Sequence, residues 1–196
     1  MFIKNLGNGF EIREVEENEF WALWEKHSPT VFDESLDFFW REHISEKEKE
    51  HLKSLRKNMG TPATLRLGVF KGTEFVGWSF GDQQSADTYY MRNSGVLKKF
   101  RKQGLYTSLL TTTIEILKER GFQKIYSRHN ATNNAVIIPK LKAGFIITAM
   151  EIDDMFGTLV HLSYYTNPLR RKMMDFRSGQ LRPDEEMKRV LSESER

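Results

Sequence analysis

The sequence predicts a mixed α+β fold in which helices flank a central sheet, in one domain that ends in a charged tail. Composition is the first reason: of 196 residues, 39% are hydrophobic and 29% charged, as in soluble globular chains. Periodicity is the second, because apolar residues recur at helical spacing near the N-terminus, alternate from residue 64, and return to helical spacing after residue 104. Length is the third, since folding a chain of this size buries about 70% of its unfolded surface.

The N-terminal quarter predicts a strand and two helices. Residues 10–15, "FEIREV", alternate between apolar and polar side chains and predict the first strand. "ENEFWALWEKH" gathers its apolar residues on one helical face, with Asn18 as the expected N-cap. "SEKEKEHLKSLRKN" predicts a second helix, begun by a capping box of Ser45 and Glu48. We expect its many charges to form a solvated surface with pairs four residues apart.

The middle of the chain predicts three antiparallel strands and a long helix. "TLRLGVF" and "EFVGWSFGD" are joined by a turn at Gly72, and "DTYYMRNSGVL" supplies the next strand. A loop around Gly104 then leads into "LYTSLLTTTIEILKER", a helix that Gly121 is expected to end. The strand that follows must return across this helix, so we expect one βαβ crossover.

The remaining segments predict a strand, a short helix and a final pair of strands. Phe122 to His129 forms the strand, "NNAVIIPKLKAGF" the helix, and "FIITAMEI" and "TLVHLSYYT" the closing pair. Residues 1–167 are therefore expected to form the domain. Residues 168–196 are highly charged and predict a peripheral helix or a mobile tail.

Composition also limits the function. The chain has no cysteine, which excludes disulfides, thiolate metal sites and a cysteine nucleophile, and which agrees with a reducing cytoplasm. Neither a signal-peptide core nor a segment of membrane-spanning length is present, so we expect a cytoplasmic protein without membrane contact. The net charge of +3 slightly favours an anionic partner, but it falls short of the dense basic stripe of nucleic-acid binders.

The loop around Gly104 predicts an anion site. Backbone N–H groups at a helix start are unpaired and together carry roughly half a positive charge. A glycine lets a bulky anion approach them, and Arg101, Lys102 and Gln103 add donors. This pattern favours a pyrophosphate over a single carboxylate, although neither a Walker loop nor G-x-G-x-x-G is present. A plain basic turn is the alternative.

"GVLKKFRKQGLYTSLL" resembles the acetyl-coenzyme A motif of the GNAT family of N-acetyltransferases, whose loop reads Q/R-x-x-G-x-G/A. Arg101 to Leu105 follow that motif, but Tyr106 replaces its last small residue and would crowd the phosphate cradle unless its ring points outward. A second family motif resembles "NAVIIPKLKAGF", and the residues in register there are Asn133, Val136, Lys142, Gly144 and Phe145. The resemblance covers roughly residues 65 to 165.

This resemblance implies the acyl-CoA N-acyltransferase fold, a sheet splayed between its fourth and fifth strands, here "DTYYMRNSGVL" and "FQKIYSRH". It implies acetyl-CoA as co-substrate in the cleft between them, and no metal. In the family the backbone at the end of the fourth strand pairs with pantetheine. The residues expected to bind the cofactor are Val96, Leu97, Lys98, Arg101, Lys102, Gln103, Gly104, Leu105, Tyr106, Thr107 and Asn133.

The resemblance also implies direct attack of an amine on the thioester while both substrates are bound, which requires no cysteine. A backbone N–H near Gly95 or Val96 would then hold the carbonyl oxygen. His129 is the first candidate base, because its intrinsic pKa suits neutral pH; the alternative is that it only hydrogen-bonds a strand end. Asp82 and Glu151 are further candidates.

Lys140 occupies the position at which many family members carry a tyrosine that protonates the departing thiolate. It is the candidate acid, with anchoring of the cofactor or a surface position as the alternatives. Pro139 precedes it, removes a backbone donor and is expected to disturb the short helix. Tyrosines on the strands offer substitutes, or belong to core and sheet-face packing, namely Tyr89, Tyr90, Tyr164 and Tyr165.

The acceptor amine is not specified. Acidic and aromatic residues between positions 20 and 60 either hold an amine or form an ordinary amphipathic face, namely Trp21, Trp24, Asp33, Glu34, Asp37, Phe38, Phe39 and Trp40. Amino acids, polyamines, peptides and antibiotics all stay open as acceptors, and exposed edge strands leave a homodimer open. Two other functions compete with the enzyme: a non-catalytic acyl-CoA-binding module and, less well supported, a nucleic-acid-binding domain.

Overall fold

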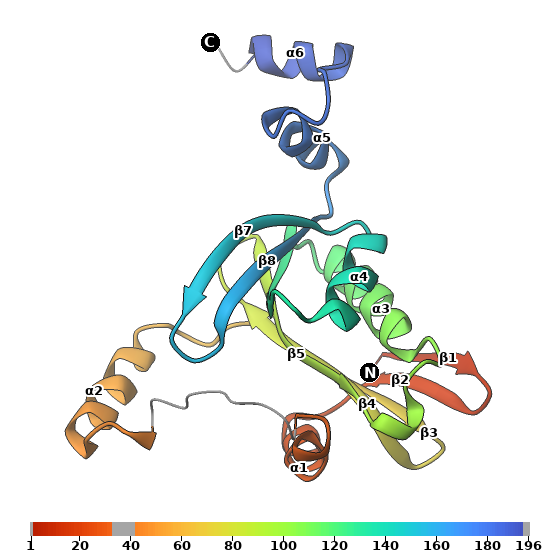
Figure 1. Ribbon diagram of the computed structural model, residues 1–196, viewed down its shortest axis with the longest axis vertical. Coiled ribbons are helices and arrows are strands. Elements are labelled where there is room, and N and C mark those ends of the chain that lie inside the picture. The colour runs from red at the N-terminus through yellow and green to blue at the C-terminus, as the bar shows by residue number, and fades with distance from the viewer. Residues whose placement is uncertain (1, 33–41, 194–196) are drawn as a thin grey trace.

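An eight-stranded sheet organises the molecule, with the strand order β1-β2-β3-β4-β5-β6-β8-β7 (Figure 1). The structure is a computed structural model and describes residues 2–32 and 42–193. The strands are β1 (Ile3–Gly7), β2 (Phe10–Glu14), β3 (Thr64–Lys71), β4 (Glu74–Gln83), β5 (Thr88–Val96), β6 (Lys124–Asn130), β7 (Ile146–Asp153) and β8 (Gly157–Tyr165). Among the described strands, β5 and β6 are the one pair that runs in parallel. The mixed α+β class and the single crossover are therefore confirmed.

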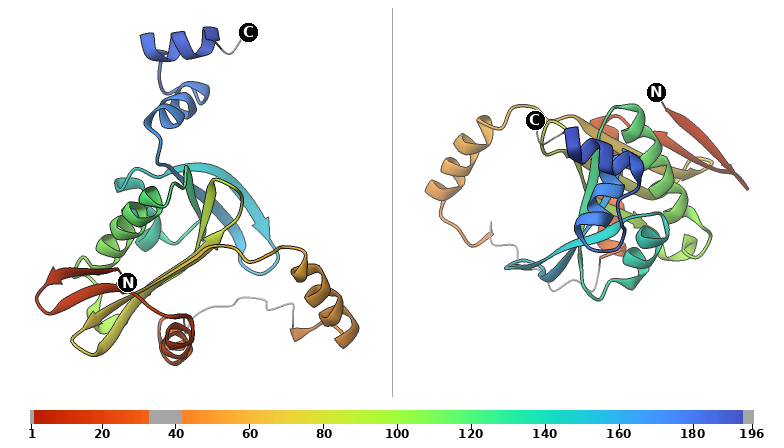
Figure 2. Two further views of the ribbon diagram at one scale, coloured as in Figure 1. Left: turned by 180° about the vertical axis from the view of Figure 1, so that it is seen from behind. Right: turned by 90° about the horizontal axis from the view of Figure 1, so that it is seen from above.

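Helices cover both faces of this sheet. The described helices are α1 (Glu17–His27), α2 (Glu46–Lys57), α3 (Leu105–Glu119), α4 (Asn134–Lys142), α5 (Pro168–Arg177) and α6 (Glu185–Glu193), with 3-10 turns η1 (Ser28–Thr30) and η3 (Lys98–Phe100). Figures 1 and 2 show α3 and α4 on one face and α1 on the other. On the α1 face, Phe20 meets Phe80 of β4 with the ring centroids 5.5 Å apart. The core thus lies between the sheet and these three helices.

β1 is a strand that the sequence expectation omitted. It forms a hairpin with β2, and the connecting residues Asn8 and Gly9 have φ angles of +52° and +77°. Such angles define the two-residue hairpin turn for which Asn-Gly is the strongest sequence signal. The strands expected to be fourth and fifth are consequently β5 and β6.

Capping residues and a glycine set the ends of the helices, as local sequence signals predict in two of three cases. Ser45 and Glu48 form both hydrogen bonds of the predicted capping box of α2. Gly121 follows α3 with a φ of +87°, as predicted for the residue that stops a helix. The predicted N-cap of α1 is wrong, because the cap position is Glu16 and Asn18 lies inside the first turn.

Two parts of the chain, the helix α2 and the C-terminal segment, lie apart from the sheet. α2 has no buried residue among those described, which agrees with its expected solvated surface, and it stands away from the strands in Figures 1 and 2. The charged C-terminal segment forms α5 and α6, which project beyond β8. Asn167 caps α5 by accepting hydrogen bonds from the backbone N–H groups of Leu169 and Arg170. The segment is therefore helical over two elements, where the sequence suggested one helix or a tail.

The sheet divides between its two parallel strands. β5 and β6 are joined by three residue pairs, namely Thr88 with Lys124, Tyr89 with Ile125 and Tyr90 with Tyr126. Beyond Tyr90, β5 continues to Val96 along β4, with an extra residue at Arg92, whereas beyond Tyr126 β6 continues along β8, with which it pairs over its whole length. The predicted splay is confirmed. Along the part of β5 after Tyr90, the edge that faces away from β4 is unpaired with any described strand.

Candidate active site

The loop after β5 has the backbone conformation of an anion site. Gly104 is the N-cap of α3 with a φ of +78°, and Lys102 also has a positive φ of +62°. No side chain caps this end of α3, and residues 101–104 are exposed. A Cβ at Gly104 would meet no atom within 4 Å, so glycine is required here by its φ angle and the space above it is open. Unpaired amides at an open helix start fit an anionic group.

The end of β5 directs two backbone N–H groups into the opening beside β6. Leu97 donates its N–H to the carbonyl of Val76 on β4, at 2.9 Å. Because hydrogen-bonding direction alternates along an antiparallel strand, the N–H groups of Ser94 and Val96 point the other way. The Val96 carbonyl also points away from β4, since it accepts a hydrogen bond from Arg101 Nε at 3.0 Å. Of the two expected positions, Val96 therefore faces the opening and Gly95 faces β4.

Tyr106 does not crowd the loop. Its ring packs against the hydrophobic core, and its buried hydroxyl has no hydrogen-bond partner among the described residues. Burial raises the pKa of this hydroxyl above its ordinary value. The side chains of Val96, Leu97 and Leu105 are also buried, so only their backbones are available to a cofactor.

The start of α3 and the start of α4, which carry the expected cofactor contacts, lie at the same edge of the sheet. Lys98 lies in η3, and Thr107 lies in the first turn of α3, where both are exposed. Asn133 is the exposed N-cap of α4, which follows β6. Since β5 and β6 are parallel, both helix starts lie at the carboxyl ends of these strands, as ligand sites in such sheets do.

Lys140 extends from α4 into the interior beside the division of the sheet. It is 1% exposed, so the surface alternative is wrong. Its Nζ donates to Ser127 Oγ on β6 at 2.7 Å and lies 3.4 Å from Met91 Sδ on β5. It also lies 4.8 Å from the ring centroid of Phe145. The ion pairs found among the described residues include no carboxylate partner for it, and burial lowers its pKa to about 7.

His129 belongs to the same group of side chains. Its Nε2 lies 2.9 Å from Ser127 Oγ, so its partner is a side chain two residues earlier on β6 rather than a strand end. Burial, and next the charge of Lys140, lower its pKa to about 3. The imidazole is therefore uncharged at neutral pH and a weak base. Sequence reasoning missed Ser127, although the spacing of Ser127 and His129 puts them on one face of a strand.

The two other candidate bases are held by guanidinium groups. Asp82 is buried and forms an ion pair with Arg92 across β4 and β5. Glu151 pairs with Arg128 at 2.8 Å and accepts a hydrogen bond from His161, and these two partners lower its pKa. The lowered pKa makes Glu151 a poor proton acceptor, and Asp82 is engaged by its ion pair.

The candidate tyrosines follow the packing alternative. Tyr89 donates to the Leu65 carbonyl at 3.3 Å inside the core, and burial raises its pKa. Tyr164 packs against the core. Arginine groups lie 5.1 Å from the ring of Tyr90 and 5.7 Å from that of Tyr165.

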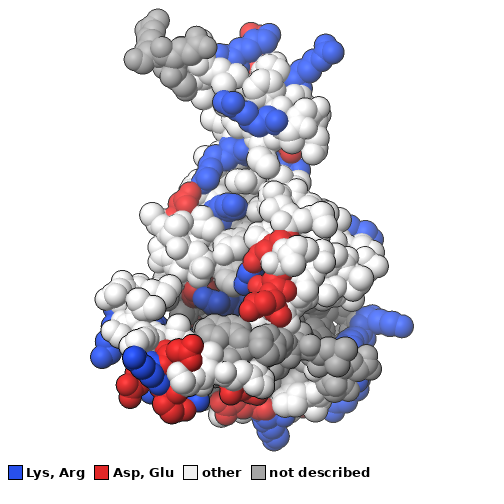
Figure 3. Space-filling view, turned by 60° about the vertical axis from the view of Figure 1, so that its left-hand side comes forward, with Lys and Arg blue, Asp and Glu red and all other residues white. Residues whose placement is uncertain are grey.

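The aromatic part of the expected acceptor region is packed rather than open. Trp21 and Trp24 meet edge-on at 5.8 Å, and both contact the ring of Phe80. The other expected residues, Asp33, Glu34, Asp37, Phe38, Phe39 and Trp40, lie outside the described residues. On the face that Figure 3 shows, described acidic and basic side chains are interspersed.

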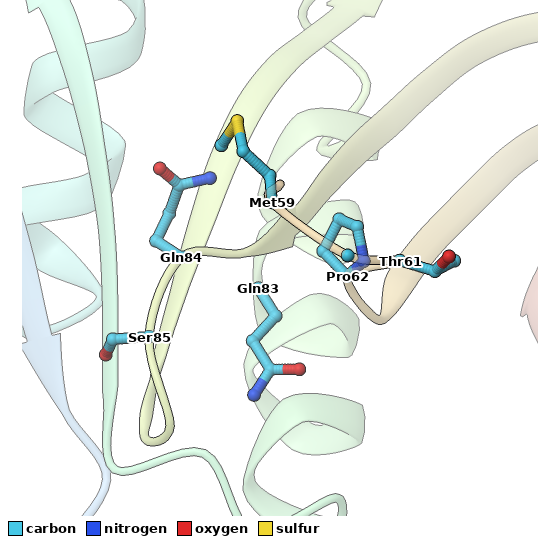
Figure 4. Close-up of a pocket in the computed structure, with 7 residues that line it drawn as sticks. Met59, Thr61, Pro62, Gln83, Gln84 and Ser85 are labelled. Carbon is cyan, nitrogen blue, oxygen red and sulfur yellow. The ribbon is translucent and has the colours of Figure 1, made fainter. Parts of the chain in front are cut away.

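A shallow pocket of about 330 Å³ lies elsewhere, between the end of α2 and the turn from β4 to β5 (Figure 4). It is lined by Met59, Gly60, Thr61, Pro62, Gln83, Gln84 and Ser85. This turn precedes β5, whereas the glycine loop follows it. A strand of nine residues separates them, which corresponds to about 30 Å. The pocket is therefore separate from the candidate site.

The described residues contain no cluster of three or more histidine, aspartate or glutamate side chains suited to a metal ion. None of the helices in the described part of the chain has the length and apolarity to cross a membrane.

Comparison with solved structures identifies the same architecture. The ribosomal-protein-S18-alanine N-acetyltransferase of Escherichia coli superposes with a TM-score of 0.58 at 19% identity, over 81% of this chain and 94% of that chain. The Salmonella typhimurium protein yncA, solved with its cofactor acetyl-CoA, gives 0.58 at 16% identity over 82% and 96%. The ribosomal L7/L12 α-N-protein acetyltransferase RimL, in complex with coenzyme A, gives 0.60 at 14% identity over 84% and 98%.

A search of curated protein sequences finds no match. The family model described as "Acetyltransferase (GNAT) family" matches residues 31–145, more than half of the chain and both sides of the divided sheet. Together with the divided sheet and the open start of α3, this match shows that the chain belongs to the GNAT family of acetyltransferases.

Proposed function

We propose that the protein is an N-acetyltransferase that transfers an acetyl group from acetyl-CoA to an amine while both substrates are bound. The observation that carries the proposal is the continuity of the free edge of β5 with the uncapped start of α3. This arrangement offers one polar backbone path to a long ligand that has an amide-containing arm and a diphosphate. Neighbouring structures with acetyl-CoA or coenzyme A bound support the choice of ligand.

The residues present fit such a ligand. The open space above Gly104 and the exposed side chains of Arg101, Lys102 and Gln103 suit the diphosphate. The backbone of Val96 and Leu97 suits the pantetheine arm, and Lys98, Leu105, Tyr106, Thr107 and Asn133 complete the proposed contacts. When bound, acetyl-CoA supplies a thioester carbonyl that an amine can attack.

Backbone donors and Lys140 would carry the chemistry. The N–H groups of Ser94 and Val96 face the opening, where they would stabilise charge on the carbonyl oxygen, a contribution of about a hundred- to a thousandfold in rate. Lys140 would protonate the departing thiolate, since its pKa of about 7 makes it both a usable acid and a usable base near neutral pH. His129, the base expected from the sequence, is too weak a base to hold the proton of the attacking amine because its pKa is lowered to about 3, so we assign it a role within the hydrogen-bonded group of Lys140.

A peptide N-terminus is the first acceptor to test. Two neighbouring structures are described as enzymes that modify ribosomal proteins, one of them at the N-terminal serine of L7/L12. These likenesses lie below 20% identity, so they support the choice of probe and not the identity of the substrate.

A combined binding and turnover assay tests the proposal. We expect acetyl-CoA to raise the melting temperature, and free thiol to appear when a panel of amines, including short peptides, is added. Stabilisation without thiol release from any amine would favour the non-catalytic binding module. A protein that acetyl-CoA does not stabilise, but that binds nucleic acid with an affinity that falls steeply with salt, would be a nucleic-acid-binding domain instead.

A further inference from the structure

We propose that Ser127 is a positioning residue that connects Lys140 to His129 and so forms the path by which protons pass between the buried lysine and solvent. The inference rests on the proposed function, because it explains how an enclosed acid regains its proton between turnovers.

The need for a path follows from burial. Lys140 and Ser127 are 1% and 0% exposed, so bulk water does not reach either polar group. An acid that gives its proton to a thiolate must recover one before the next turnover. A lysine at the surface would recover it from water directly, whereas Lys140 depends on its neighbours inside the protein.

Among the described side chains that contact Lys140 Nζ, one can relay a proton. Met91 on β5 offers a sulfur atom, and Phe145 offers a ring face, and neither carries an exchangeable proton. On β6, Ser127 offers a hydroxyl that can donate and accept at once, at 2.7 Å from Nζ.

The path continues from Ser127 to the edge of the molecule. His129 Nε2 lies 2.9 Å from Ser127 Oγ, and the imidazole is partly exposed near the end of β6. An imidazole accepts a proton on one nitrogen while it releases one from the other. The three side chains therefore form an unbroken series from the interior to solvent.

The proton balance is complete. Lys140 in its ammonium form gives one proton to the thiolate sulfur and becomes an amine. The attacking nitrogen releases one proton to solvent as the new amide forms and the carbon–sulfur bond breaks. A solvent proton then enters at His129 Nδ1, the Nε2 proton moves to Ser127 Oγ, and the hydroxyl proton moves to Lys140 Nζ. The imidazole then exchanges its Nδ1 proton with solvent and returns to the Nε2–H tautomer, which restores the starting state.

Ser127→Val and Ser127→Thr are the matched variants, because they have nearly the same shape and differ in the hydroxyl. Solvent exchange of the Lys140 side-chain protons, followed by NMR in the full-length protein without substrate, measures the path directly. We expect exchange in Ser127→Val to be slower than in Ser127→Thr by about tenfold or more. Equal exchange in the two variants would overturn the proposal.

Turnover supplies an independent readout. At a pH where Lys140 begins protonated, the first turnover of Ser127→Val should stay within about twofold of Ser127→Thr, while steady-state kcat falls about tenfold. An equal fall of both rates, or a rise in KM for acetyl-CoA, would show a structural role instead. If the natural protein releases no thiol, the proposed function fails, and the exchange measurement still decides whether the path exists.

Discussion

Lys140 lies in an unusual environment for a lysine, because its side chain is buried. A lysine ammonium buried without a carboxylate is unfavourable, and its three neighbours offer only one hydroxyl oxygen, one thioether and one ring. Such burial lowers stability, and this cost supports the proposed chemical role of Lys140. The same burial predicts how stability depends on pH.

Replacing Lys140 with methionine should stabilise the protein, and more so at pH 7 than at pH 10. The folded-state pKa of about 7 lies below the unfolded value near 10.4, so the unfolded chain binds more protons between these limits. The destabilisation caused by burying the charged lysine is fully present below pH 7. It disappears as the pH rises from about 7 to about 10.4. We expect a gain on the order of a few kcal/mol at pH 7.

Urea unfolding at both pH values measures this difference, with Lys142→Met as an exposed control on the same helix. A gain that does not depend on pH would contradict the assignment. The same Lys140→Met variant should lower steady-state thiol release by at least about a hundredfold, with acetyl-CoA affinity unchanged, if Lys140 acts as the acid.

At Gly104 a negative charge should prevent cofactor binding. Gly104→Asp and Gly104→Asn have the same shape, and both residues tolerate a positive φ, so the pair isolates charge. We expect Gly104→Asp to bind acetyl-CoA at least about tenfold more weakly than Gly104→Asn, because a carboxylate faces the diphosphate. Calorimetry measures both affinities. Equal affinities would place the diphosphate elsewhere.

At the scale of elements, the division between β5 and β6 depends on the packing of β5 against β4. A Cβ at Gly95 would lie 2.7 Å from the Trp78 ring, whose Nε1 donates to Asn93 Oδ1 at 2.8 Å. Glycine is required here by close approach rather than by its φ angle. The indole therefore holds the end of β5, and with it the N–H groups that face the opening.

Gly95→Ala should consequently destabilise the protein by ~1–3 kcal/mol, since the added methyl group must displace the indole. Unfolding in urea measures this loss. In a Trp78→Phe background, where the ring is smaller, the same substitution should cost less. A cost that is the same in both backgrounds would show that the indole is not the obstacle.

Most elements were predicted from sequence because their signals are local. The capping box of α2, the alternation of β3 and β4, and the glycine after α3 each depend on neighbouring residues. β1 was missed because its two apolar residues, Ile3 and Leu6, are three positions apart and so do not alternate as a strand requires, although Asn8 and Gly9 are a hairpin signal. The burial of Lys140 could not be predicted, since it depends on Met91 and Ser127, distant in sequence.

At the scale of the whole molecule, α5 and α6 project beyond β8 rather than packing as a layer on the sheet (Figures 1 and 2). Their contacts with the rest of the described chain include the ion pair of Arg170 with Asp87, the cation–π contact of Arg170 with Tyr165 and the hydrogen bond from Arg171 to the Gly144 carbonyl. The exposed ion pair contributes about 0–1 kcal/mol, and a hydrogen bond from a charged group contributes about 1.5–3 kcal/mol. Residues 1–167 are therefore proposed as the folding unit.

A chain that ends at Asn167 should fold and bind acetyl-CoA with an affinity within about threefold of the full chain. Circular dichroism and calorimetry test the two statements separately. A truncated chain that folds but no longer binds would show that α5 supports the site, through Gly144 at the end of α4.

The central claim is that coenzyme A occupies the division of the sheet, with its diphosphate on the amides that begin α3. A crystal structure of the protein with coenzyme A tests this most directly. We expect diphosphate oxygens within hydrogen-bonding distance of the backbone N–H groups of residues 102–105, and the thiol beside Lys140. A diphosphate bound away from this loop, or a thiol remote from Lys140, would contradict it.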